Sequence, residues 1–368
     1  MDIDFFNRIL SIDSTSGKEG NLADMLAAEM TAPGRVVRTF EVGDGTRNLM
    51  VSWGEPKVVF CSHLDTVPPY IAPEFISEGT SSSQIVRGRG ACDAKGQIFA
   101  MYEACKALEA QGREGFALLL LAGEETGSFG AKAFSSLGQD VLFHEDAVVI
   151  VGEPTDNCMA TAAKGTKSFE VTFTGEAFHS GYPEYGRSAV LMFNDFLNAL
   201  RSIVFPSDEI LGETTWNVGK LVSDNPQNIL SPELTCRVYF RTTFESDEMV
   251  CNVMRNMAGP DARLRFGRPR VQDGSDIVAK ELAPWQRFMS VKEFGGDVPT
   301  RFEILDGFPS KPVSFGSDAP QLKCFRKKIL CGPGSILVAH RDDEHLCMKD
   351  IQTAMNNYVR MFEILTAE

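Results

Sequence analysis

Long apolar runs alternate with helix-spaced apolar positions through residues 1–155. Mostly apolar segments predict buried strands at 47–53, 57–62, 116–123 and 146–152. Helical spacing of apolar residues predicts helices near 20–30, 95–111 and 128–137. Continuous Val, Ile and Leu strands separated by helices are typical of a mainly parallel sheet covered by helices on both sides. We therefore predict a mixed α/β fold for this region.

The pattern changes between about residues 164 and 273. Strands in which apolar and polar residues alternate are predicted at 167–175, 214–221, 233–242 and 262–268. Two amphipathic helices are predicted at 187–204 and 245–257. Few long strands with two helices indicate a small α+β sandwich.

A helix-like segment at 281–294 and a strand-like segment at 327–332 return to the earlier pattern. The simplest organisation is a small domain inserted into a larger one. We predict a larger domain from residues 1–165 and 274–368, interrupted by an inserted domain over 166–273.

Composition narrows the class of protein. The 368 residues are 43% apolar, which suits two soluble domains, and no apolar run is long enough to span a membrane. Nine cysteines form an odd total without a CxxC pair, so we expect reduced thiols and a cytoplasmic location. The net charge of −14 disfavours binding to nucleic acid and to anionic membranes. Small polar molecules are the expected partners.

Five groups able to bind metal ions lie just after predicted strands or just before a predicted helix. They are His63, Asp93, Glu124, Glu125 and Glu153. In open α/β sheets, ligands bind in the crevice beyond the carboxyl ends of the strands. We therefore expect these side chains to gather at one edge of the sheet.

Neutral imidazole and carboxylate oxygens suit Zn²⁺ or a similar divalent ion, and two such ions about 3.5–4 Å apart can share a carboxylate. A paired site needs two terminal ligands for each ion, one bridge and one free base. We assign the terminal places to His63, Glu125, Glu153 and one further histidine, the bridge to Asp93 and the base to Glu124.

The missing histidine can be sought among the five in the chain. His340 follows a Gly-Pro-Gly turn that would return the chain over the site, whereas His345 lies among charged residues, so we choose His340. Asp65 is two residues from His63, on the same side of an extended chain. It is expected to bind the ring nitrogen of His63 that faces away from the metal.

Each signal has an ordinary explanation when it is taken alone. The His63-Leu64-Asp65 segment could be a polar turn, the Glu124-Glu125 pair a surface charge, and Glu153 a plain strand exit. Their joint placement at strand ends favours a metal site. Two carboxylates after six apolar residues are costly unless a cation neutralises them.

Five segments, HLDTVP, GRGACDAKG, EETGSFGA, GEPT and GPGSILVAH, resemble the M20 family of dinuclear zinc amidohydrolases in order along the whole chain. That family includes acetylornithine deacetylase, succinyl-diaminopimelate desuccinylase and several peptidases. The resemblance implies a zinc-peptidase-like catalytic domain with an inserted lid and dimerisation domain. It also implies two divalent ions, Zn²⁺ with Co²⁺ or Mn²⁺ as alternatives.

Roles carry over from the resemblance by motif. His63 and Glu153 would hold one ion, and Glu125 and His340 the other, with Asp93 bridging and Glu124 as general acid/base. A cis peptide bond is implied between Asp93 and Ala94.

Within the inserted domain, GEAFHSGYPEYGRSA resembles the dimerisation segment of the family. It implies a homodimer in which His179 reaches the active site of the neighbouring subunit and binds the oxyanion. The segment NILSPELTCRVYFR resembles the lid, which implies that Asn228 and Arg241 bind a substrate carboxylate. FGSDAP, with Ser317 and Asp318, resembles a substrate-lining loop.

Alternatives remain for these residues, since His179 also fits a local turn and Arg241 a plain strand end. The sequence departs from the family pattern at Phe178, where alanine is more usual. It also departs in the lid stretch KLVSDNPQN, which replaces a glycine-rich turn. These departures leave the acyl preference open.

The predicted function is hydrolysis of the amide of a small N-acyl amino acid, such as acetylornithine, acetylcitrulline or succinylornithine, in amino-acid and arginine biosynthesis. Glu124 would act as general acid/base on a metal-bridging water. The alternatives are a dipeptidase or aminopeptidase with the same metals and a succinyl-diaminopimelate desuccinylase. A catalytically silent small-molecule binder is a further alternative, against which the intact Glu124 argues.

Overall fold

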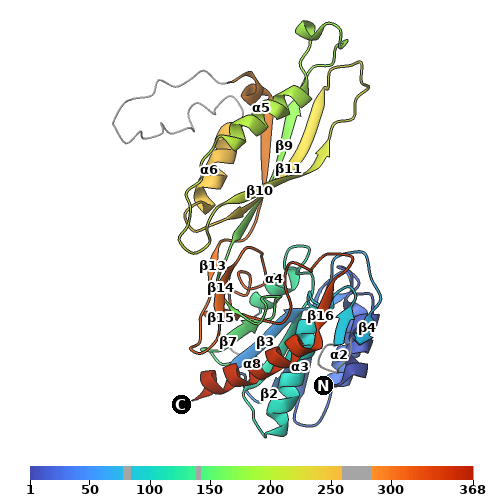
Figure 1. Ribbon diagram of the computed structural model, residues 1–368, viewed down its shortest axis with the longest axis vertical. Coiled ribbons are helices and arrows are strands. Elements are labelled where there is room, and N and C mark those ends of the chain that lie inside the picture. The colour runs from blue at the N-terminus through green and yellow to red at the C-terminus, as the bar shows by residue number, and fades with distance from the viewer. Residues whose placement is uncertain (78–83, 138–141, 259–282, 368) are drawn as a thin grey trace, which may run out of the picture. The chain divides into compact units, whose positions relative to one another are not determined.

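The computed structural model describes residues 1–77, 84–137, 142–258 and 283–367 and divides the chain into two compact units (Figure 1). The first comprises Met1–Ala162, Arg301–Val313 and Ser317–Glu368, and the second comprises Ala163–Thr300 and Ser314–Gly316. The predicted domain limits at 165/166 and 273/274 stay predictions. The second of these limits lies outside the described residues, as does the predicted strand at 262–268.

A six-stranded sheet forms the centre of the first unit. Its strands are β1 (Val36–Gly43), β2 (Thr46–Trp53), β3 (Val58–His63), β6 (Phe116–Leu121), β7 (Val148–Val151) and β15 (Lys327–Leu330). The order is β1-β2-β6-β3-β7-β15, with β3 parallel to β6 and β7, and β7 parallel to β15. Every residue of β3, β6 and β7 is buried, as expected for continuous apolar strands covered on both faces.

Among the described residues, the first unit has five α-helices: α1 (Ile3–Ser11), α2 (Gly20–Met30), α3 (Lys95–Ala110), α4 (Phe129–Ser135) and α8 (Met348–Thr366). The apolar sides of α1, α2, α3 and α8 share one core with the sheet, which explains the predicted helical spacing. Two small three-stranded sheets lie beside the large one, and the second of them includes the residues at which the chain passes between the two units. One is β16-β5-β4 (His345–Cys347, Gln84–Arg87, Glu74–Ser77), and the other is β13-β8-β14 (Thr300–Arg301, Met159–Ala163, Ser310–Val313).

The second unit is an antiparallel sheet with helices on one face. Its strands are β9 (Gly165–Thr174), β10 (Thr215–Val222), β11 (Glu233–Thr242) and β12 (Met289–Gly295), in the order β10-β11-β9-β12. Helices α5 (Ala189–Arg201) and α6 (Asp247–Met257) pack on the buried side chains of β9 and β11. The predicted fold class is confirmed: a mixed, mainly parallel sheet with helices, and a separate α+β domain.

The helix predicted over 281–294 is wrong. The described part of this segment forms a short 3₁₀ helix, η4 (Pro284–Phe288), followed by strand β12. Met289 and Val291 of β12 pair with β9 and contribute to its core, so tertiary pairing overrides the helix-like spacing. A second 3₁₀ helix, η3, spans Pro183–Tyr185.

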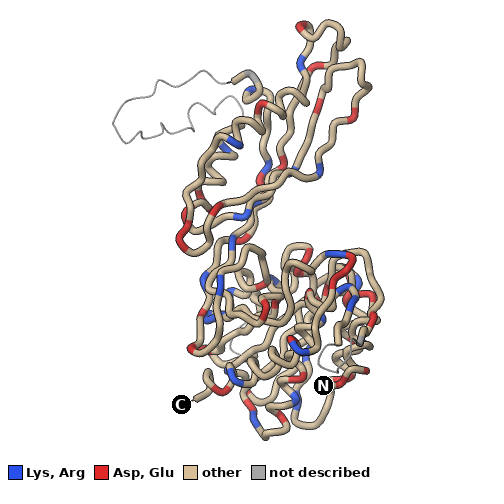
Figure 2. The backbone as a smooth tube through the Cα atoms, in the orientation of Figure 1, with Lys and Arg blue, Asp and Glu red and all other residues tan. Residues whose placement is uncertain are grey.

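Acidic and basic residues are distributed along the backbone of both units (Figure 2). Among the described residues, no helix combines the length and the apolar content needed to cross a bilayer.

Candidate metal centre

Parallel strands deliver four of the predicted groups to one edge of the sheet. His63 is the last residue of β3, Glu124 and Glu125 follow β6, and Glu153 follows β7. Because β3 lies between β6 and β7 and runs parallel to both, their carboxyl ends meet at the same edge. The expected convergence therefore follows from strand order.

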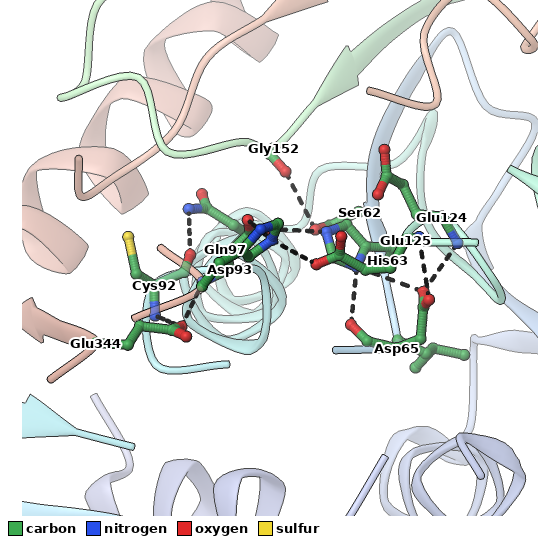
Figure 3. A network of polar contacts seen from close by, with 12 residues as sticks. Ser62, His63, Asp65, Cys92, Asp93, Gln97, Glu124, Glu125, Gly152 and Glu344 are labelled. Atoms are coloured by element: carbon green, nitrogen blue, oxygen red, sulfur yellow. Dashed lines mark hydrogen bonds and ion pairs between the residues drawn. The ribbon is translucent and has the colours of Figure 1, made fainter. Parts of the chain in front are cut away.

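Asp93 and His340 reach this edge from other segments. Asp93 lies in the turn before α3, and the cis peptide bond between Asp93 and Ala94 is confirmed. Oδ1 of Asp93 lies 3.0 Å from Nε2 of His63 (Figure 3), and Oδ2 lies 3.2 Å from Nε2 of His340. The two oxygens of one carboxylate thus face two different imidazoles.

The side chains form two groups that share Asp93. His63, Asp93 and Glu153 make the buried group, and Asp93, Glu125 and His340 make the outer group. In each group the candidate ligand atoms lie within 4.8 Å of one another. His63 and Glu153 are only 1% and 4% exposed, whereas the His340 side chain is 48% exposed. Each group offers one imidazole nitrogen and two carboxylates, a donor set that suits Zn²⁺.

The two histidine rings are the main source of positive charge beside the carboxylates at this edge. In the part of the chain that the structure describes, no lysine or arginine forms an ion pair with Asp93, Glu124, Glu125 or Glu153. Desolvation raises the pKa of Glu124 and of Glu153 well above the usual carboxyl value, and neighbouring carboxylates add to both shifts. Divalent cations would supply the missing positive charge, so the residues fit a paired metal site.

The neighbouring carboxylates also raise the pKa values of the two histidines. Hydrogen bonds with Asp93 and Glu125 raise the pKa of His340 to about 10. Burial acts to lower the pKa of His63, but hydrogen bonds with Asp65 and Asp93 raise it well above its usual value. Without cations, both rings would therefore carry protons that a metal ion has to displace.

Asp65 has a broader role than the one predicted. The closest partner of His63 Nδ1 is the main-chain carbonyl of Asp65, at 2.9 Å, and the carboxylate lies 3.5 Å away. The carboxylate also accepts the N–H groups of Glu124 and Glu125, at 2.9 and 3.1 Å, and the hydroxyl of Ser16, at 2.8 Å. Asp65 therefore fixes the backbone that carries Glu124 and Glu125 (Figure 3). Ser16 was not predicted, because a serine in a polar turn carries no distinctive signal.

Glu124 belongs to neither of the two groups. It lies beside His63 and Glu125 in a third cluster of possible donors. The backbone bond to Asp65 holds it next to both groups. A carboxylate with a raised pKa next to a metal site has the properties of a general base.

Ser317 also belongs to the first unit. It is 2% exposed, and its hydroxyl accepts the N–H of Ala319 at 3.3 Å, so it shapes its own loop. The charge of the adjacent Asp318 contributes to the raised pKa of Glu124 and of Glu153. This predicted loop therefore lies near the metal centre.

The other predicted substrate residues belong to the second unit. His179 is exposed, and its Nδ1 accepts the N–H of Gly181 at 3.1 Å. Its segment pairs with that of Asn228, because Ser180 N–H donates to the Asn228 carbonyl at 2.9 Å. Arg241 lies on β11 with its guanidinium 5.1 Å from the centre of the Tyr239 ring. The structure thus brings His179 and Asn228 together.

Comparison with known proteins agrees with this geometry. Residues 59–279 match the family model described as Peptidase family M20/M25/M40. A probable carboxypeptidase of Aspergillus niger is 29% identical over an alignment 393 residues long, which covers 98% of this chain and 89% of that protein.

Two solved structures share the fold. A tripeptidase from Staphylococcus aureus has a TM-score of 0.77 at 20% identity, covering 99% of this chain and 97% of that one. A dipeptidase from Saccharomyces cerevisiae has a TM-score of 0.72 at 11% identity, covering 99% and 95%.

Proposed function

Because the chain belongs to Peptidase family M20/M25/M40, we propose that it is a metal-dependent peptidase that cleaves dipeptides or removes the last residue of short peptides. The relatives support this choice of substrate, since they are named carboxypeptidase, tripeptidase and dipeptidase. We therefore favour the peptidase alternative over the acetylornithine deacetylase that was predicted from the sequence.

One observation carries the proposal. A single carboxylate, Asp93, faces His63 with one oxygen and His340 with the other, and Glu124 lies beside them outside both ligand groups. His63 with Glu153 would hold one ion, and His340 with Glu125 the second. Zn²⁺ is the proposed metal, and Co²⁺ and Mn²⁺ are the alternatives.

The bound ions would polarise the scissile carbonyl and lower the pKa of water to near neutrality. Glu124 accepts a proton from the attacking water and then delivers it to the leaving amine, for which its raised pKa suits it. Asp65 keeps the Glu124 backbone in place through both steps.

Residues of the second unit are proposed to bind the substrate and the oxyanion. The planar guanidinium of Arg241, together with Asn228, would bind the free carboxylate of the substrate. His179 would donate a hydrogen bond to the oxyanion from a neighbouring subunit. Exposed apolar residues support a homodimer through this unit, namely Val190 and Leu191 of α5 and Leu221 and Val222 of the edge strand β10.

A second candidate is deacylation of N-acyl amino acids, including acetylornithine and succinyl-diaminopimelate. These compounds also carry an amide beside a free carboxylate, so the same metals, Glu124 and Arg241 would serve. The pocket for the group on the amine side would separate the two activities.

The test is a comparison of kcat/KM after loading the protein with Zn²⁺, Co²⁺ or Mn²⁺. The substrates are a dipeptide panel, tripeptides, acetylornithine, acetylcitrulline, succinylornithine and succinyl-diaminopimelate. We expect metal-dependent hydrolysis, fastest for a peptide. Faster turnover of an N-acyl amino acid would replace the peptidase assignment with the second candidate, and hydrolysis of none of them would contradict both.

A further inference from the structure

A buried ion pair lies behind the metal centre, between residues 255 positions apart in the chain. Nη1 of Arg89 donates to Oε2 of Glu344 at 2.6 Å, and each residue is only 1% exposed. Neither side chain supplies an atom to the ligand groups. A buried pair of this kind is weak evidence for stability, because desolvation offsets much of the attraction, so its other contacts indicate its role.

Glu344 holds the segment that carries the shared ligand. Its second oxygen, Oε1, accepts the N–H groups of Cys92 and Asp93, both at 3.0 Å (Figure 3). Charge-assisted bonds from a carboxylate to backbone N–H groups are strong and directional. They fix the backbone from which the Asp93 carboxylate faces both histidines.

Arg89 extends the network to two other ligand segments. Its Nη1 donates to the carbonyl of Arg341, at 3.1 Å, directly after His340. Its Nε donates to the carbonyl of Pro69, at 3.2 Å, in the segment that follows His63 and Asp65. One guanidinium therefore connects the segments of the two histidine ligands to the carboxylate that holds Asp93.

We propose that Arg89 and Glu344 are positioning residues of the metal centre, whose ion pair sets the spacing of the His63, Asp93 and His340 segments for cation binding. The inference rests on the proposed metal dependence and adds the device that keeps three distant segments in register. Groups that orient metal ligands typically change metal affinity by about 10–100-fold when they are removed.

The first unit offers a control pair of the same residue types, although its glutamate is 32% exposed. Arg35 forms an ion pair with Glu109, and Nε of Arg35 donates to Oε1 of Glu109 at 2.8 Å. The Arg35 side chain is 10% exposed, and its carboxylate partner lies on α3, near the end opposite to Asp93. Removing this pair changes packing without touching a ligand segment.

The experiment compares Glu344→Gln and Arg89→Met with Glu109→Gln and Arg35→Met in the full chain. Zn²⁺ affinity is measured by chelator competition, and the visible absorption of the Co²⁺-loaded protein reports ligand geometry. Circular dichroism with and without metal reports folding. We expect about 10–100-fold weaker binding and an altered Co²⁺ spectrum in the first two variants, with wild-type values in the control variants.

Each other outcome decides against the inference. Wild-type affinity and spectrum in Glu344→Gln and Arg89→Met would overturn the positioning role while leaving the proposed function standing. Failure of both variants to fold even in saturating Zn²⁺ would make the pair a general structural element. Absence of divalent-ion binding in the wild-type protein would overturn the proposed function itself.

Discussion

The two ligand groups use similar donors in different surroundings. The buried group, His63, Asp93 and Glu153, is almost closed to solvent, whereas His340 of the outer group exposes 48% of its side chain. A buried ligand set is held by strands and dense packing, but an exposed one depends on a loop. We therefore expect the buried group to be rigid and slow to exchange its ion, and the outer group to exchange its ion more readily.

The largest expected effect is the loss of activity when the proposed base, which lies outside both ligand groups, is replaced. Glu124→Gln keeps the shape of the side chain but removes the base, so kcat should fall by about 10²–10⁴-fold. Metal content should stay at the wild-type value, because Glu124 belongs to neither group. Steady-state kinetics and metal analysis of the same preparation measure both quantities.

The exposed Glu145→Gln is the control for this change, and it should keep full activity. If Glu124→Gln retained activity within a few-fold of the wild type, Glu124 would not be the base.

The next effect is a difference in stability between variants of the buried group and of the outer group, measured in cation-free protein. His63→Ala empties a buried position and should lower the free energy of unfolding by about 2–4 kcal/mol. His340→Ala removes a half-exposed ring, and the loss should be about 1 kcal/mol or less. Urea denaturation in the presence of a chelator measures both values. Equal losses would mean that the groups do not differ in burial as described.

The effect of a single pH unit on metal affinity is the most modest change expected. The pKa of His340 is raised to about 10 in the cation-free protein, above the ordinary 6.5. The ring is therefore protonated at pH 7.5, and because a cation must displace that proton, the release of this one proton should make metal affinity rise with pH up to about 10, by up to tenfold per unit.

The same shift affects the stability of the cation-free protein. Since the folded pKa lies above the unfolded one, the contribution of His340 is fully present below about pH 6.5. It is lost as the pH rises through about 10.

Calorimetric titration in buffers of different ionisation enthalpy measures the proton that His340 gives up when metal binds. It should show less proton release on metal binding by His340→Ala than by the wild type. Equal release from the two proteins would assign the proton to another group.

Sequence reasoning succeeded where a local pattern determines position. The uninterrupted apolar strands β3, β6 and β7 lie side by side, so the polar residues after them had to meet. It failed for 281–294, where spacing suited a helix but pairing with β9 made a strand. It also missed the bonds of the Asp65 carboxylate to Glu124 and Glu125, because spacing from His63 says nothing about the loop after β6.

Arg89 and Glu344 show a second reason for such misses. Nothing in the residues around either one indicates the other, because their contact depends on how distant loops return to the same edge of the sheet. Ligand types can be read from motifs, whereas the partners that orient the ligands are set by tertiary structure.

The most direct test is a crystal structure of the Zn²⁺-loaded protein with anomalous diffraction recorded at the zinc edge. We predict two peaks about 3.5–4 Å apart, one between His63 and Glu153 and the other between His340 and Glu125, with Asp93 between them. A single peak, or peaks away from Asp93, would contradict the paired site on which the proposed function depends.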